Sequence, residues 1–331
     1  MSISFSSLQD QQEPTRPAAT RAGSSDTTDN QDAMPDYVAD KGNTSYMVVP
    51  ETPRPLLRSS SSRAPSKFVV QSVHLRECMA EFLGTFIMIC FGMGVNNQVG
   101  LSNDANGTWL SINVCWGIAV MLGVHASEGV SGAHLNPSVT FANAVYGKLP
   151  WRKVPGYFFA QFLGAFIGAF VIYALDYQTL NLVDPDRLTS QAHFATYPKS
   201  HISNLTAFYT EFLGTLFLVL GVYAITDKRN RPAGAYGAPV AFALLIMAIG
   251  MAFGMNTGYA INPARDFGPR LLTCLAGWGS KVFTVRDHYF WIPLVAPLLG
   301  GVTGGGLYKV LVEMHIPQEH ASSVDILGAM V

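Results

Sequence analysis

Charged residues are scarce in this chain of 331 residues: Lys, Arg, Asp and Glu make up 13% of it, and the formal net charge is −1. An average soluble domain carries about 25% charged residues, so a soluble globular protein is disfavoured. The chain also lacks a basic patch interleaved with aromatic residues, so we expect no nucleic-acid partner. Hydrophobic residues account for 49% of the chain, and this balance is typical of an integral membrane protein.

Cysteines are few, and none of the four lies in a Cys-x-x-Cys or other metal-type spacing. Cys78, Cys90, Cys115 and Cys274 fall in or beside apolar stretches, as small buried thiols do. The polar residues of the apolar stretches form no cluster of nucleophile, base or metal ligands. We therefore expect no metal, no cofactor and no enzymatic activity.

The chain divides into polar tails and an apolar body. Residues 1–75 are rich in Ser, Pro, Asp, Arg and Gln without a sustained apolar period, so we expect a disordered tail. Residues 313–331 are expected to form a C-terminal tail, and 76–312 a membrane-spanning domain. This body contains six runs near the length that crosses a bilayer. They lie at about 79–97, 109–127, 154–175, 205–226, 235–255 and 289–312.

Lys and Arg are unevenly distributed among the connections between these runs. The second-to-third connection contains Lys148, Arg152 and Lys153, and the fourth-to-fifth is similarly basic, whereas 98–108 contains neither residue type. Because basic residues are enriched in cytoplasmic loops, both termini are predicted to be cytoplasmic. A polybasic stretch before the first run predicts contact with membrane lipid. A multi-pass protein of the plasma membrane is therefore expected.

Two short segments repeat each other, each after an apolar run: 131–138 reads SGAHLNPS and 257–265 reads TGYAINPAR. Asn at the N-cap and Pro at the first helical position favour a helix start. The surrounding segments, about 130–147 and 257–275, are too short to span a bilayer. Backbone at membrane depth must be enclosed by protein or line a wet cavity, so we predict two re-entrant half-helices.

A second pair of landmarks supports an internal duplication. Glu81-Phe-Leu-Gly-Thr recurs at Glu211, 130 residues later, and the Asn-Pro motifs are 126 residues apart. The repeats are about 76–175 and 205–312, each with three spans and a half-helix. Because three is odd, an all-α inverted repeat with a site at the midplane is predicted. Ionisable residues inside spans are usually partnered, so we expect both Glu side chains to accept hydrogen bonds from the re-entrant loops.

Small residues spaced four apart lie in several spans. They are Ala160, Gly164 and Gly168, the pair Gly250 and Gly254, and the pair Gly300 and Gly304. Such spacing lets helices approach closely in lipid, and close helix packing is expected at all of them.

The paired boxes SGAHLNPSVT and GYAINPARDFGPR resemble those of the major intrinsic protein family, the aquaporins and aquaglyceroporins. The resemblance covers residues from about 77 to 312. It implies that family's six-helix fold with two half-helices and a homotetramer. It also implies a passive channel for water and small uncharged polyols such as glycerol that excludes ions and protons. The expected partners are water, glycerol, other small neutral solutes and membrane lipid.

The pore centre is expected where the two half-helices meet, because their N-termini aim positive dipole ends into the pore. Each Asn can present an amide donor to a solute, while the unwound loops offer carbonyl acceptors. Ser138 stands where the family usually has Ala, and its hydroxyl can bond the backbone. The predicted pore centre is Asn136, Pro137, Ser138, Asn262, Pro263 and Ala264, and the predicted lumen carbonyls are those of Gly132, Ala133, His134, Leu135, Gly258, Ala260 and Ile261.

The resemblance places the family's selectivity filter by spacing from these boxes. Gly250 stands where water-only relatives carry His, so it is expected to widen the ring. Trp116 and Tyr259 then offer apolar walls to a carbon backbone, and Arg265 offers donors to hydroxyls. Positions at which aquaglyceroporins differ from water channels are Asp266, Arg270, Pro293 and Leu294.

Two other functions stay open. One is a water-selective pore with little glycerol flux, against which Gly250 argues. The other is a membrane junction or scaffold protein with a closed pore, because the family fold also serves adhesion.

Overall fold

The computed structural model describes residues 69–317, and its regular elements are helical throughout this range. The first half contains α1 (Val73–Leu101), α2 (Trp109–Ser131), α3 (Pro137–Val145), α4 (Val154–Leu175) and α5 (Tyr177–Val183). The second half contains α6 (Asn204–Thr226), α7 (Gly234–Phe253), α8 (Pro263–Thr273), α9 (Lys281–His288) and α10 (Ile292–Leu311). Short turns of 3-10 or π geometry, among them η2 (Ser190–His193), lie between them.

Within residues 69–317, six helices are long and apolar enough to cross a membrane: α1, α2, α4, α6, α7 and α10. The predicted fold class is confirmed. The first helix begins earlier than the apolar run, at Val73, because the Ser72 side chain caps it by accepting a hydrogen bond from Leu75 N. The end of the segment predicted to be disordered is thus helical. The predictions for 1–68 and 318–331 lie outside the described residues.

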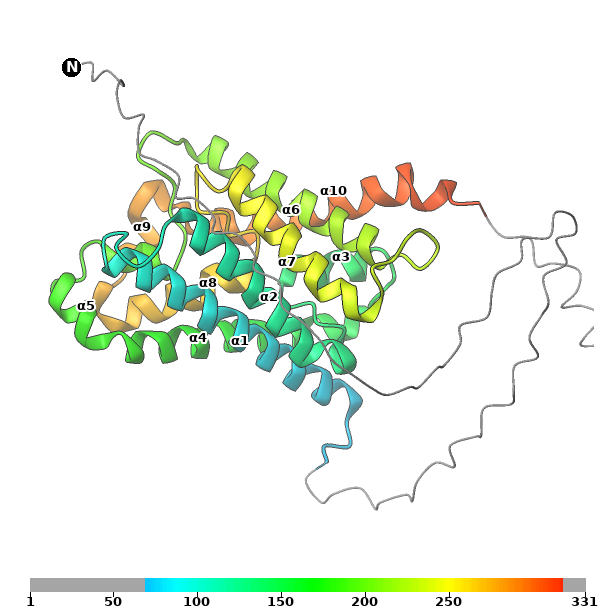
Figure 1. Ribbon diagram of the computed structural model, residues 1–331, viewed down its shortest axis with the longest axis horizontal. Helices are drawn as coiled ribbons and strands as arrows, with labels where there is room; N and C mark the ends of the chain where they lie inside the picture. Colours follow the sequence, from blue (N-terminus) through cyan, green and yellow to red (C-terminus); the bar gives the residue numbers. More distant parts are fainter. Residues whose placement is uncertain (1–68, 318–331) are drawn as a thin grey trace, which may run out of the picture. The chain divides into compact units, whose positions relative to one another are not determined.

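The two half-helices enter the bundle from opposite ends (Figure 1). Helix α3 lies at the end that carries the α6–α7 loop, whereas α8 lies at the end that carries α5 and α9. They have nine and eleven residues, or about 14 and about 17 Å at 1.5 Å per residue. Neither crosses a hydrocarbon core of about 30 Å, so each ends its run inside the protein.

Glycines allow the long helices of each half to touch. A Cβ added to Gly164 would lie 2.5 Å from Phe82 O, so α4 rests on the backbone of α1. In the second half, Gly300 and Gly304 bring α10 onto α6, where a Cβ would meet the carbonyls of Phe212 and Leu216. The expected close packing is confirmed at these positions.

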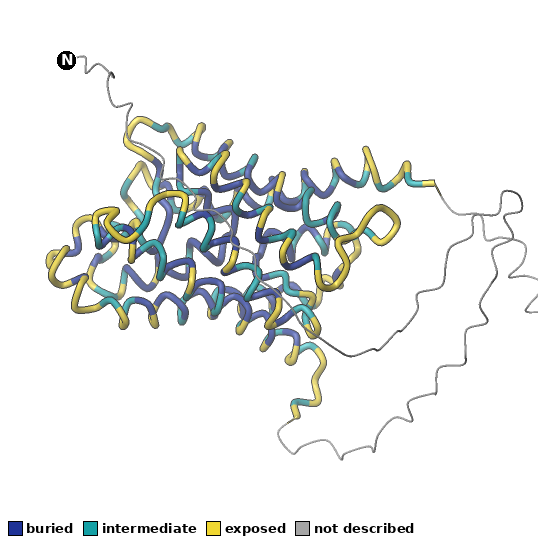
Figure 2. Tube along the Cα trace, viewed as in Figure 1, coloured by how far each residue is buried: buried dark blue, intermediate teal, exposed yellow. Residues whose placement is uncertain are grey.

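The outer surface of the helix bundle is apolar, unlike the surface of a water-soluble protein. Figure 2 shows buried stretches along the sides of the helices that face one another. Large apolar side chains are exposed on the outer faces of α1, α4, α6 and α7, including Leu83, Phe159, Phe170, Phe217 and Leu244. An apolar outer surface of this extent requires lipid or another apolar partner.

Candidate functional site

The loops that precede α3 and α8 have matching backbone conformations. Residues with positive φ recur 126 positions apart, at Gly132, Ala133 and Leu135 and at Gly258, Tyr259 and Ile261. A residue other than Gly at positive φ costs about 1–3 kcal/mol and persists only when its surroundings hold it there. Both loops must therefore be held by strong contacts.

Glu81 of α1 holds the first loop. Its two carboxylate oxygens accept hydrogen bonds from the backbone N–H groups of His134 and Leu135, both at 2.8 Å. The hydroxyl of Ser131 and the amide of Gln161 donate to the same carboxylate. This fully buried side chain thus satisfies backbone donors that no helix or strand can satisfy.

Glu211 of α6 repeats this arrangement in the second loop. It accepts hydrogen bonds from Ala260 N at 3.0 Å and Ile261 N at 2.7 Å, and from the hydroxyl of Thr257 at 2.7 Å. Tyr289 donates to it at 3.3 Å. At both duplicated Glu positions the carboxylate therefore accepts from two loop N–H groups and one loop hydroxyl, while the fourth donor differs, Gln161 in one half and Tyr289 in the other.

Reciprocal hydrogen bonds join the two half-helix starts. The Oδ1 atoms of Asn136 and Asn262 cap their own helices, accepting from Ser138 N and from Ala264 N and Arg265 N. Asn136 Nδ2 donates to Ile261 O, and Asn262 Nδ2 donates to Leu135 O, both at 2.8 Å. Each amide carries two N–H groups, and the second can donate to a solute.

A cavity of about 220 Å³ passes this junction. Apolar side chains such as Val120, Val124 and Phe242 line it, as do both re-entrant loops. Eleven predicted site residues line it: Gly132, Ala133, His134, Leu135, Asn136, Ala260, Ile261, Asn262, Trp116, Tyr259 and Arg265. The lining thus combines apolar side chains of α2 and α7 with the two loops.

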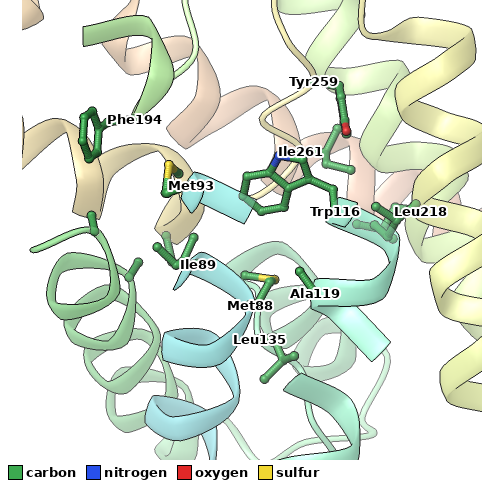
Figure 3. Packing of buried hydrophobic residues seen from close by; sticks show 14 of the residues in the cluster. Met88, Ile89, Met93, Trp116, Ala119, Leu135, Phe194, Leu218, Tyr259 and Ile261 are labelled. Atoms are coloured by element: carbon green, nitrogen blue, oxygen red, sulfur yellow. The ribbon is translucent and has the colours of Figure 1, made fainter. Parts of the chain in front are cut away.

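Trp116, Tyr259 and Arg265 meet at one end of the cavity. The guanidinium carbon of Arg265 lies 4.4 Å from the centroid of the Trp116 ring, and its Nη1 donates to Phe194 O at 3.0 Å. The Tyr259 ring packs edge-on against Trp109, with ring centroids 5.9 Å apart. Figure 3 shows the indole of Trp116 near Tyr259, with Met88 and Ala119 beyond it.

Lys148 lines the cavity near Tyr223 and Thr226, at the end of α6. Its Nζ lies 3.4 Å from the centroid of the Tyr223 ring. Burial lowers the pKa of Lys148, although Glu313 and Asp227 act in the opposite direction. A cation resting on an aromatic face therefore stands at this mouth.

Comparison with known proteins decides the family. The family model for the major intrinsic proteins matches residues 69–308. The chain belongs to this family.

Relatives within the major intrinsic protein family match this chain over most of their own length. The chain is 42% identical to Aquaporin-9 of Mus musculus, over 78% of this chain and 90% of that protein. It is 46% identical to Aquaglyceroporin-2 of Rhizophagus irregularis, over 71% and 77%. The X-ray structure of the aquaglyceroporin from Plasmodium falciparum matches with a TM-score of 0.66 and 35% identity, covering 73% of this chain and 98% of that one.

Gly250 of this major intrinsic protein lies directly against the Tyr259 ring. A Cβ there would lie 2.5 Å from Tyr259 Cζ and 2.7 Å from its hydroxyl oxygen, and it would overlap Asn113 Oδ1. At Gly254 a Cβ would lie 2.6 Å from Tyr259 Cδ1. The space that the absent side chains leave is thus filled by the Tyr259 ring. This pair of glycines seats an aromatic ring rather than only letting two helices approach, and Gly250 does not line the cavity.

Several other expected site residues also stand outside the cavity lining. Ser138 differs most from expectation, because its buried hydroxyl has no hydrogen-bond partner among residues 69–317 and does not bond the backbone. Pro137 and Pro263 begin the half-helices and act through the backbone. The cavity lining also leaves out Ala264, Gly258, Pro293 and Leu294.

Asp266 and Arg270 form a clamp on the segment between α5 and α6. Both are fully buried, with Arg270 Nε 2.8 Å from Asp266 Oδ1. The N–H and hydroxyl of Thr196 donate to Asp266, and Arg270 donates to Thr196 O and Val282 O. These two residues therefore anchor the segment whose Phe194 carbonyl contacts Arg265, and neither lines the cavity.

Sequence reasoning missed two residues that touch the filter. Asn96 accepts a hydrogen bond from Trp116 Nε1 at 3.1 Å, and its one signal was an amide inside an apolar run. Phe194 contributes through its backbone carbonyl to Arg265, and a backbone contact leaves no mark on residue type.

Proposed function

We propose that this chain is a passive channel for water and small uncharged polyols such as glycerol, and not an enzyme. The cavity at the junction of the two half-helices carries this proposal. Glycerol has a carbon edge and a hydroxyl edge. The apolar wall of the cavity suits the first, and the Asn amides, loop carbonyls and Arg265 suit the second. Relatives named Aquaporin-9 and Aquaglyceroporin-2 support the same assignment.

Exclusion of ions follows from the charges around the junction. Each half-helix N-terminus carries about half a positive charge, and the reciprocal Asn contacts bring the two together. Arg265 adds a buried full charge beside them. A cation would lose its hydration and meet three positive groups, which makes its passage costly. Two donors that orient the water at the centre interrupt a proton relay.

The remaining expectations concern assembly and location. We assign residues 76–312 to the channel domain, with repeats at about 76–175 and 205–312, and place both tails in the cytoplasm on the basis of the basic loops. A homotetramer in the plasma membrane, in contact with lipid, completes the proposal. Exposed side chains such as Phe159 and Leu244 support burial of the outer faces in lipid or in neighbouring copies.

Vesicles that contain the purified protein test the function by stopped-flow light scattering. Both water and glycerol should equilibrate faster than in empty vesicles. Val124→Trp fills the cavity from a buried lining position and should abolish both fluxes. Leu244→Trp adds the same ring at an outward position that is 59% exposed, and should leave both fluxes intact. Water flux alone would indicate a water-selective pore, and neither flux a closed scaffold.

A further inference from the structure

One face of α1 seats both a filter residue and the segment outside the filter. Gly92, Asn96 and Gly100 are spaced four apart, so they share this face. A Cβ on Gly92 would lie 2.5 Å from Trp116 Cζ2, and one on Gly100 would lie 2.6 Å from His193 Cε1. The two rings therefore rest directly on the helix, one turn before and one turn after Asn96.

The amide of Asn96 connects the two ring-bearing residues. Its Oδ1 accepts a hydrogen bond from Trp116 Nε1 at 3.1 Å, and its Nδ2 donates to His193 O at 3.0 Å. The indole N–H is thus paired in an apolar surrounding, where an unpaired donor is costly. One side chain fixes both the plane of the indole and the position of the His193 backbone.

The same segment also holds the charged wall of the filter. Phe194 follows His193 directly, and its carbonyl accepts the hydrogen bond from Arg265 Nη1 at 3.0 Å. Arg265 in turn lies over the face of Trp116. A shift of the His193 backbone would therefore reach Arg265 through one peptide unit, and a rotation of Trp116 would remove the surface on which Arg265 rests.

We propose that Asn96 is a positioning residue of the filter that sets the preference of this channel for glycerol over water. This inference rests on the proposed function. Glycerol needs the indole flat against the wall, because it is wider than water and slides its carbon edge along the ring. Without the amide, the ring turns about its side-chain bonds into the lumen and obstructs the wider solute more than the narrower one.

Asn96→Leu tests the inference, because Leu has nearly the same size and neither donates nor accepts a hydrogen bond. The ratio of glycerol to water permeability in vesicles should fall about fivefold, the factor that corresponds to the net worth of one hydrogen bond. Asn97→Leu is the matched control: this neighbouring amide donates to Asp176 Oδ2 at 2.8 Å and does not contact the filter. The control should leave the ratio unchanged even where it lowers thermal stability.

Trp116→Phe approaches the same hydrogen bond from the other side, keeping an aromatic wall without the N–H donor. If Asn96 acts through the indole, the two substitutions should be non-additive, and Asn96→Leu should change the ratio little in the Phe background. An unchanged ratio in Asn96→Leu, or additive effects in the double variant, would overturn the inference. If Asn96→Leu does not fold, an unchanged ratio in Trp116→Phe also overturns it. Absence of glycerol flux in the unaltered protein would instead remove the proposed function itself, and this inference with it.

Discussion

Gly250→Ala places one methyl group where the Tyr259 ring rests on α7. Its Cβ would lie 2.5 Å from Tyr259 Cζ, whereas non-bonded carbon atoms settle at about 3.5–4.0 Å. The ring must therefore move by about 1 Å. Helix α7 lies behind it and Trp109 packs against it at 5.9 Å, so the open direction is the cavity that Tyr259 lines.

The cost to glycerol follows from the packing. Overpacking of this kind costs about 1–3 kcal/mol, and glycerol must push the ring back to pass. With a tenfold change for each 1.4 kcal/mol, glycerol permeability should fall by about 5- to 150-fold. Water needs less width, so its permeability should fall by a smaller factor. Gly250→His should act in the same direction with a larger effect.

Stopped-flow measurements on reconstituted vesicles give both permeabilities from the same sample. Gly129→Ala is the control, because a Cβ on this α2 glycine would meet nothing within 4 Å. Tyr259→Leu added to Gly250→Ala should restore glycerol flux by removing the displaced ring. Equal loss of water and glycerol, or a double variant as slow as the single one, would refute the reasoning.

Three further outcomes are expected from buried ionisable groups. Glu211→Gln replaces one acceptor by a donor facing the loop N–H groups, so the free energy of unfolding should fall by about 1–3 kcal/mol and the melting temperature with it. Asp266→Leu leaves the buried Arg270 without its partner, so the free energy of unfolding should fall by about 3–5 kcal/mol. The double variant Asp266→Leu/Arg270→Met, which removes both charges, should lose less. Burial lowers the pKa of His193, although Asp184 opposes this. Below about pH 6.5 the unfolded chain therefore binds a proton at this residue more readily than the native protein does, so the free energy of unfolding should fall as the pH drops below that value.

Each of these outcomes has its own check by thermal unfolding of the purified protein. An unchanged melting temperature in Glu211→Gln would show that the loop does not need the second carboxylate oxygen. If the double variant Asp266→Leu/Arg270→Met is less stable than Asp266→Leu alone, the unpaired charge of Arg270 is not the cause of the lost stability. His193→Gln should remove the loss of stability between about pH 7 and about pH 5, and a loss that persists belongs to another group.

Local chemistry explains what the sequence could predict. Asn136 and Asn262 precede Pro, and this cap signal needs only neighbouring residues, so both half-helix starts could be located. Glu81 and Glu211 were recognisable because a carboxylate inside an apolar run must be partnered. Trp116 and Arg265 came from the resemblance to the family, which places its filter at fixed spacings from the motifs, and both line the cavity.

Contacts between distant segments explain what the sequence could not predict. Gly250 suggests free space, yet the side chain of Tyr259, which comes from the loop before α8, fills that space. Asn96 reads as one polar residue among others in α1 until the segment between α5 and α6 is placed beside it. The carbonyl of Phe194 has no signature in residue type at all.

The duplication repeats the backbone of the two loops but not the side chains that line the cavity. Arg265 follows the second Asn-Pro pair, and the residue 126 positions earlier, Val139, also lines the cavity. The Tyr259 position corresponds in the same way to Ala133, whose backbone shares its positive φ. The backbone is thus repeated while the side chains differ: Arg265 and Tyr259 stand in the second half where Val139 and Ala133 stand in the first. If a solute exchanges its hydration at Arg265, the matching position Val139 offers no second charged donor to hold it, and this asymmetry favours release of the solute.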